Sequence, residues 1–117
     1  MEDKALILRD LFRISDRQHN IPWQPFREGV DIQVLYGNIE NGPATALLRY
    51  QPGASVPEHI HTGFEHVLVL SGSQTDRQGE YEIGTLAINA PGTSHNVKSE
   101  NGCIVLIIWE KPVYICP

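Results

Sequence analysis

Hydrophobic residues gather in short runs rich in β-branched side chains, and turn dipeptides separate these runs. Runs of this length are typical of strands, whereas a helix needs a longer segment with a period of about 3.6 residues. We therefore predict strands at residues 31–37, 45–51, 65–71, 80–89 and 103–110. Pairs such as Pro52-Gly53 and Pro91-Gly92 provide the fixed or positive φ angles that tight turns require.

Many short strands at regular spacing indicate an all-β sandwich or small barrel. Several runs are apolar on both faces, which favours a closed or double-layered arrangement over one open sheet. Residues 4–13 are expected to form either a helix or an N-terminal strand. Residues 19–30 contain two prolines and are expected to form an irregular arm. Its Trp23 and Phe26 would pack onto the body of the protein or across a subunit boundary.

The chain of 117 residues has the size of one domain, which we divide into an N-terminal arm (1–30) and a barrel (31–117). Its formal net charge is −5 and its basic residues are scattered, which excludes a nucleic-acid partner. The longest apolar run, 103–109, is too short to cross a membrane. The N-terminus lacks the features of a signal peptide, so we expect a cytoplasmic location.

The two cysteines, Cys103 and Cys116, form no CxxC pair and fit no zinc-finger spacing. We expect Cys103 to be buried and Cys116 to be free near the C-terminus.

Three histidines and two glutamates lie within residues 58–66. On a strand, His59 and His61 point to the same face because side chains alternate with a period of two. The same alternation from Glu65 places this carboxylate on one face with Val67 and Val69, while His66 lies on the other. A carboxylate on an apolar strand face needs a cation or strong donors beside it. The spacing therefore indicates a metal site, although each residue taken singly is more typical of a polar strand surface.

A fourth ligand is offered by His95, which follows Pro91-Gly92 at the start of a segment that can run as a strand beside the first pair. Three imidazole nitrogens and one carboxylate oxygen suit Zn, Fe(II), Mn, Ni or Cu, and no thiolate is available in the cluster to narrow that range.

Residues 53–72 resemble the first motif of the cupin superfamily: Gly53, His59, His61, Glu65 and Gly72 stand at the family's spacing. The second cupin motif is matched by Gly84, Gly92 and His95. Its proline is displaced to Pro91, and Ser99 replaces its asparagine. The resemblance implies a small single-domain cupin, a jelly roll also described as a double-stranded β-helix barrel.

Residues 47–109 also resemble the C-terminal cupin-like domain of ChrR-type anti-sigma factors. The shared features are "LLRY.PGA", the hairpin pattern "D..G.Y..G" (Asp76, Gly79, Tyr81, Gly84), "PG.SH" and "SENGC". This resemblance implies that His59, His61, Glu65 and His95 are the metal ligands and that zinc is a suitable occupant. ChrR-type proteins bind their sigma factor through an N-terminal zinc domain with one histidine and a CxxC pair. Residues 1–45 contain no cysteine, so the resemblance implies the fold and the metal site but not sigma-factor binding.

Two functions remain open from the sequence. The first is a sensor or regulatory module with a divalent metal, zinc or iron before manganese or nickel, that responds to a small-molecule ligand or an oxidant. The second is a metal-dependent dioxygenase acting on a small dicarbonyl or aryl ketone. No general base stands out, because His66 lies on the opposite strand face and His19 lies in the arm. The tyrosines that are available as pocket groups are more typical of core or cross-strand positions: Tyr36, Tyr50 and Tyr81. Because cupins commonly dimerise and the arm is a natural element for exchange, we expect a homodimer.

Overall fold

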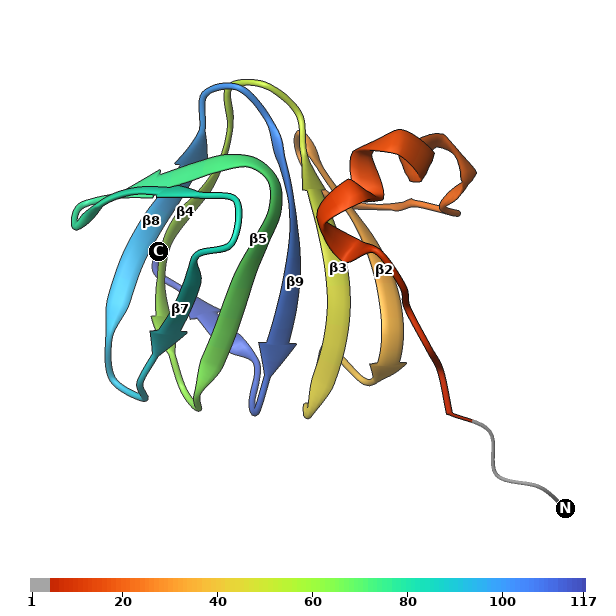
Figure 1. The fold of residues 1–117 in the computed structure, drawn as a ribbon. Coiled ribbons are helices and arrows are strands. Elements are labelled where there is room, and N and C mark those ends of the chain that lie inside the picture. Colours follow the sequence, from red (N-terminus) through yellow and green to blue (C-terminus); the bar gives the residue numbers. More distant parts are fainter. Residues whose placement is uncertain (1–4) are drawn as a thin grey trace, which may run out of the picture.

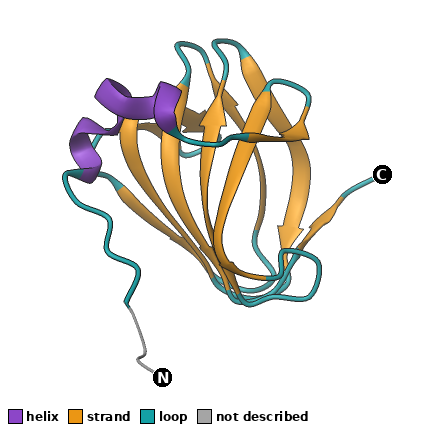
Figure 2. Cartoon of the chain, turned by 90° about the vertical axis from the view of Figure 1, so that its right-hand side faces the viewer, coloured by secondary structure: helices purple, strands orange, loops and turns teal. Residues whose placement is uncertain are grey.

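The computed structural model describes residues 5–117, whose strands form one strongly curled sheet (Figures 1 and 2). The strands are β1 (Gln24–Arg27), β2 (Val30–Gly37), β3 (Ala44–Tyr50), β4 (Ala54–His61), β5 (Glu65–Asp76), β6 (Gly79–Glu82), β7 (Leu86–Asn89), β8 (Ser94–Ser99), β9 (Cys103–Trp109) and β10 (Val113–Ile115). Their order in the sheet is β1-β2-β3-β9-β5-β8-β4-β10, and β6 and β7 also pair with β5. The predicted all-β barrel is confirmed.

Strand β5 connects the two halves of the barrel. Its first residues pair with β7 and β9, while its last residues pair with β6 and, at Thr75, with β8. A register shift between Val69 and Ser71 marks the change from one half to the other. The inner face of the barrel buries an apolar core that includes Val69, Val105 and Trp109. The metal-ligand candidates lie on this inner face, beside that core.

A 3₁₀ segment, η1 (Leu11–Asn20), covers part of the outer face of the sheet (Figure 1). Ile14 of η1 is buried against Leu47, Leu70 and Ile104. The prediction of a helix or strand at 4–13 was therefore wrong in its limits, because the helical segment begins at Leu11 and residues 5–10 have no regular structure. Residue 4 lies outside the described residues.

The prediction of an irregular arm at 19–30 was wrong for part of that range. Residues Gln24–Arg27 form β1, which pairs with β2, and Phe26 packs against the inner core. Trp23 packs against the outer cluster, so both aromatic residues contact the body of the protein. The division into an arm (1–30) and a barrel (31–117) stays a prediction.

The single strand expected at 80–89 is interrupted. Residues 79–82 form β6 and residues 86–89 form β7, with a turn between them. β6 pairs with the end of β5 and β7 with its beginning, so the chain must step from one half of the barrel to the other. The backbone of this turn forms hydrogen bonds with the backbone of Val69, at the point where β5 passes from one half of the barrel to the other. The other expected strands are found with shifted ends, and β5 extends to Asp76.

The expectations for the two cysteines are met. Cys103 is buried, Cys116 is half-buried, and both are free thiols. Within residues 5–117, no helix is long and apolar enough to cross a membrane.

Candidate metal centre

Three strands place the four candidate ligands on the inner face of the barrel. β4 carries His59 and His61, β5 begins with Glu65, and β8 carries His95. β4 and β8 are antiparallel neighbours, and His59 lies directly opposite His95 in their register. The expected strand beginning near His95 is thus confirmed. A register shift in β4 between Val56 and His59 turns both histidines of β4 inward.

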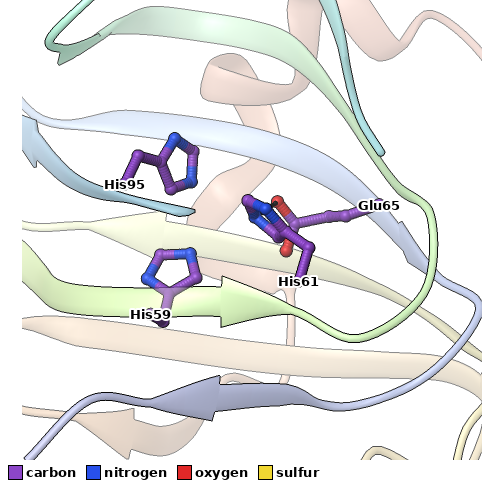
Figure 3. A group of neighbouring side chains, drawn as sticks. All are labelled: His59, His61, Glu65 and His95. Carbon is purple, nitrogen blue, oxygen red and sulfur yellow. Dashed lines mark ion pairs between the residues drawn. The ribbon is translucent and has the colours of Figure 1, made fainter. Parts of the chain in front are cut away.

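The four side chains converge on one point, as Figure 3 shows. One ligand atom from each side chain lies within 4.8 Å of the others. The centroids of the imidazole rings are 5.1 Å apart for His59 and His61, 4.7 Å for His59 and His95, and 4.8 Å for His61 and His95. His59, His61 and Glu65 are buried, and His95 is half-buried. The sequence predicted this set of residues, and the structure brings all four together.

The Nδ1 atom of each imidazole ring forms a hydrogen bond with an oxygen outside the cluster. The Nδ1 atom of His59 lies 2.8 Å from the Pro57 carbonyl oxygen, and that of His61 lies 3.0 Å from the Thr93 carbonyl oxygen. The Nδ1 atom of His95 lies 2.9 Å from Oδ2 of Asp76. A carbonyl or carboxylate oxygen accepts a hydrogen bond, so each Nδ1 carries the proton and donates it. Each Nε2 therefore keeps a free lone pair, which is the tautomer that a metal requires.

Glu65 is held by two donors on neighbouring strands. Nδ2 of Asn89 donates to its Oε1 at 3.0 Å, and Nε1 of Trp109 donates to its Oε2 at 2.8 Å. The carboxylate retains lone pairs that face the histidines, since an ionised carboxylate accepts about four hydrogen bonds. Oε1 lies 3.2 Å from Nε2 of His61.

The chemistry of this donor set fits a divalent cation. Nε2 of His61 and Nε2 of His95 are buried, and neither has a hydrogen-bond partner among residues 5–117. With their Nδ1 protons donated elsewhere, these nitrogens and the Glu65 oxygens are lone pairs that face one another. Buried polar atoms without a partner are costly, and lone pairs that face one another also repel. A cation among them satisfies all of these atoms at once.

The electrostatics of the cluster favour the protonation states that a metal needs. Burial lowers the pKa of His59 and so keeps its imidazole neutral. Burial raises the pKa of Glu65, but the hydrogen bond that Trp109 donates favours the ionised carboxylate, and this pKa lies below its ordinary value. The cluster thus contains a neutral imidazole and an ionised carboxylate at neutral pH.

Two polar residues next to the ligands in sequence lie outside the cluster, and for His66 the alternation of side chains along the strand predicted this. His66 is on the outer face of β5. Glu58 forms an ion pair at the surface with Arg77. Sequence reasoning did not assign the residues that orient the ligands: Asp76, Asn89, Thr93 and Trp109. Only Asp76 carried a signal, because it belongs to the hairpin pattern that contains Tyr81.

Two cavities border the cluster. The inner one has a volume of about 50 Å³, and its walls include His59, Glu65 and His95 together with apolar core residues. The outer one has a volume of about 210 Å³ and lies between β7, the start of β8 and the tip of the β5–β6 hairpin. Its walls include Asp76, Asn89 and Thr93, which hold His95, Glu65 and His61 in place.

Comparison with known families agrees with this geometry. Residues 13–111 match the family model described as the ChrR cupin-like domain. The chain belongs to this family. Within the ChrR cupin-like family, the anti-sigma-E factor ChrR of Cereibacter sphaeroides is 30% identical over 103 residues, which are 86% of this chain and 47% of that protein. The chain therefore spans about half the length of this curated relative.

Solved structures share the fold. The complex of Rhodobacter sphaeroides SigE with the anti-sigma ChrR matches with a TM-score of 0.71 and 22% identity, over 92% of this chain and 70% of that one. An acetylacetone dioxygenase from Acinetobacter johnsonii matches with a TM-score of 0.76 and 17% identity, over 100% of this chain and 80% of that one. At these identities the matches show the cupin fold alone.

Proposed function

We propose that this chain is a metal-binding cupin module with a sensor or regulatory role, in which His59, His61, Glu65 and His95 hold one divalent cation. One observation supports this proposal. The Nε2 atoms of His61 and His95 are buried beside the Glu65 carboxylate and have no hydrogen-bond partner among the described residues. The Nδ1 atoms of the same two rings donate their protons to oxygens outside the cluster. Nitrogen and oxygen ligands of this kind suit zinc or iron, with manganese or nickel as alternatives.

The inner cavity beside the cluster is small, which supports a regulatory module, whereas the outer cavity of about 210 Å³ is closer to the size of an organic-ligand pocket and supports the second candidate below. Pockets that enclose organic ligands have volumes of roughly 300–1,000 Å³. The inner cavity has about 50 Å³, which suits a few water molecules rather than a dicarbonyl substrate. A change at the centre, such as ligand exchange or oxidation, would act through the strands that carry the four residues.

Membership of the family does not by itself identify the binding partners of this chain. The name of the C. sphaeroides relative describes an anti-sigma factor, but this chain spans 47% of that protein. Residues 1–45 lack the cysteines of the sigma-binding zinc domain, so sigma-factor binding is not part of this proposal. A homodimer, a small-molecule ligand and a cytoplasmic location stay predictions.

A second candidate is a metal-dependent dioxygenase acting on a small dicarbonyl or aryl ketone. It is favoured by the ligand set, because three histidines and one glutamate leave open positions on a six-coordinate metal. A metal ion in such a site supplies Lewis-acid polarisation and a template for substrate. The chain would contribute the four ligands, and the donors Asn89 and Trp109 would orient Glu65.

Metal analysis separates the two candidates. We expect the chain, purified anaerobically without added metal, to contain about one divalent ion per chain and to take up no O₂ with dicarbonyl or aryl ketone substrates. The His59→Ala variant, prepared in parallel, controls for adventitious metal. Stoichiometric iron with substrate-dependent O₂ uptake would replace the regulatory function with the dioxygenase. A wild-type chain that contains only traces of divalent metal, at the level of this control, would refute the metal site itself.

Metal affinity is expected to fall with decreasing pH. Imidazole binds a metal only in its neutral form, so protons compete for the three histidines. The ordinary pKa of histidine is about 6.5, and burial places that of His59 below it. Proton competition at His59 therefore begins below this pH, so affinity is nearly constant from about pH 7 to 8 and falls steeply towards pH 5. Zinc titrations at each pH, corrected for buffer and chelator, measure this, and a flat profile from pH 8 to 5 would contradict it.

A further inference from the structure

The β5–β6 hairpin carries the pattern Asp76, Gly79, Tyr81, Gly84. None of these four residues is a candidate metal ligand, so the metal site alone does not explain the pattern. The hairpin turns at Arg77 and Gln78, between the paired residues Asp76 and Gly79. Its tip lies against β4 and β8, since Arg77 contacts both Glu58 and the Ser94 carbonyl oxygen. These contacts bring the end of β5 to the half-buried side of the metal cluster.

Asp76 connects this hairpin to a candidate ligand. Its Oδ2 accepts a hydrogen bond from Nδ1 of His95 at 2.9 Å. Its Oδ1 accepts from the Tyr81 hydroxyl at 2.7 Å and from the Gln78 backbone N–H at 2.8 Å. The Asp76 side chain is only 7% exposed. Three donors from two sides thus fix the orientation of the carboxylate.

His95 depends on a side chain for its orientation more than the other two histidines do. The backbone carbonyls of Pro57, in β4, and Thr93, just before β8, accept from His59 and His61, and the Thr93 hydroxyl oxygen also lies 3.0 Å from Nδ1 of His61. The His61 side chain is 1% exposed, and that of His95 is 13% exposed, so packing restrains His95 less. Within residues 5–117, Asp76 is the hydrogen-bond partner recorded for the Nδ1 atom of His95.

We propose that Asp76, braced by Tyr81, is a positioning residue that holds His95 in the tautomer with a free Nε2 and thereby sets how tightly the metal is retained. This proposal rests on the proposed metal site. Partners of metal-binding histidines commonly change metal affinity by 10- to 100-fold when they are removed. The pattern of Asp76 and Tyr81 in the hairpin then belongs to the metal centre, although neither residue is a ligand.

The variant Asp76→Asn tests this mechanism because the side chain keeps its shape while the group that faces His95 changes from a hydrogen-bond acceptor to a donor. The amide oxygen accepts from Tyr81 and Gln78 in place of Oδ1, so the NH₂ group faces Nδ1 of His95. That nitrogen must then accept, which moves the ring proton to Nε2 and removes the lone pair from the metal. A change from carboxylate to amide beside a catalytic histidine is known to impose the wrong tautomer in the same way.

Zinc is the probe, and the full chain is used in each case. We expect Asp76→Asn to weaken zinc binding about 10- to 100-fold and to speed zinc loss to a chelator. Tyr81→Phe, which removes one brace, should act in the same direction by a smaller factor. Asp31→Asn is the matched control, because Asp31 pairs with Arg49 away from the cluster and its loss should leave zinc binding unchanged.

A second readout does not depend on metal. ¹⁵N NMR of the metal-free protein should show the His95 proton on Nδ1 in the wild type and on Nε2 in a substantial fraction of Asp76→Asn. Wild-type zinc affinity in Asp76→Asn together with an unchanged tautomer would overturn the proposal while leaving the metal site intact. A wild-type chain that binds no zinc overturns the proposed function and, with it, the role in metal retention. If Asp76→Asn fails to fold, an unchanged affinity in Tyr81→Phe overturns the proposal.

Discussion

The His59→Ala and His95→Ala variants will each lose metal affinity by a factor of about 100 or more. Structural zinc sites with four ligands have apparent binding free energies of about 10–16 kcal/mol, so one ligand accounts for roughly 3 kcal/mol. Each variant also leaves the three remaining ligand groups in place without a complete coordination shell. The two residues lie opposite each other on β4 and β8, so they test the two strands separately.

The matched control is His66→Ala. His66 follows a candidate ligand directly in sequence but lies on the outer face of β5, so its loss should leave metal affinity unchanged. Metal content by elemental analysis and zinc affinity by chelator competition measure all three variants. Full metal content in both His59→Ala and His95→Ala would show that the ligand set is wrong. A loss in only one of them would mean that another residue completes the set.

The Gly72→Ala variant will be far less stable than the wild type, by about 2–5 kcal/mol in the free energy of unfolding. Gly72 has a φ of +71°, a conformation that costs a non-glycine residue about 1–2 kcal/mol. An added Cβ would also overlap the Gly102 carbonyl oxygen and lie 2.9 Å from Cα of Cys103. These are backbone atoms of the neighbouring strand region, and relieving such overpacking adds about 1–3 kcal/mol.

Gly53→Ala separates the backbone strain from the overlap. Gly53 begins the same cupin motif and has a φ of +84°, but no heavy atom of the described residues lies within 4 Å of an added Cβ. We expect this variant to lose only about 1–2 kcal/mol. Urea unfolding of the metal-free proteins, monitored by tryptophan fluorescence, measures both values. Equal losses in the two variants would show that the close approach of Gly72 to Gly102 contributes nothing.

The local sequence pattern was sufficient to predict the candidate ligands, because the spacing of residues along a strand fixes the face to which each side chain points. A separation of two residues places His59 and His61 on one face of a strand, and the alternation along β5 separates Glu65 from His66. The apolar strands could also be predicted from local pattern, since β3 and β9 are nearly continuous runs of buried residues and β2 alternates buried and partly exposed residues at its start. Strands β1, β4 and β10 were not predicted, because two contain proline and β10 has only three residues.

The sequence by itself determined the candidate ligand set on a cupin barrel: His59, His61, Glu65 and His95. Only the tertiary structure decided which nitrogen of each ring is free. That depends on acceptors on other elements, such as Asp76 at the hairpin and the Thr93 carbonyl before β8. The register shift in β4 and the change of halves in β5 bring these acceptors to the cluster. Both features arise from pairing between segments far apart in the chain, which local hydrophobic periodicity does not encode.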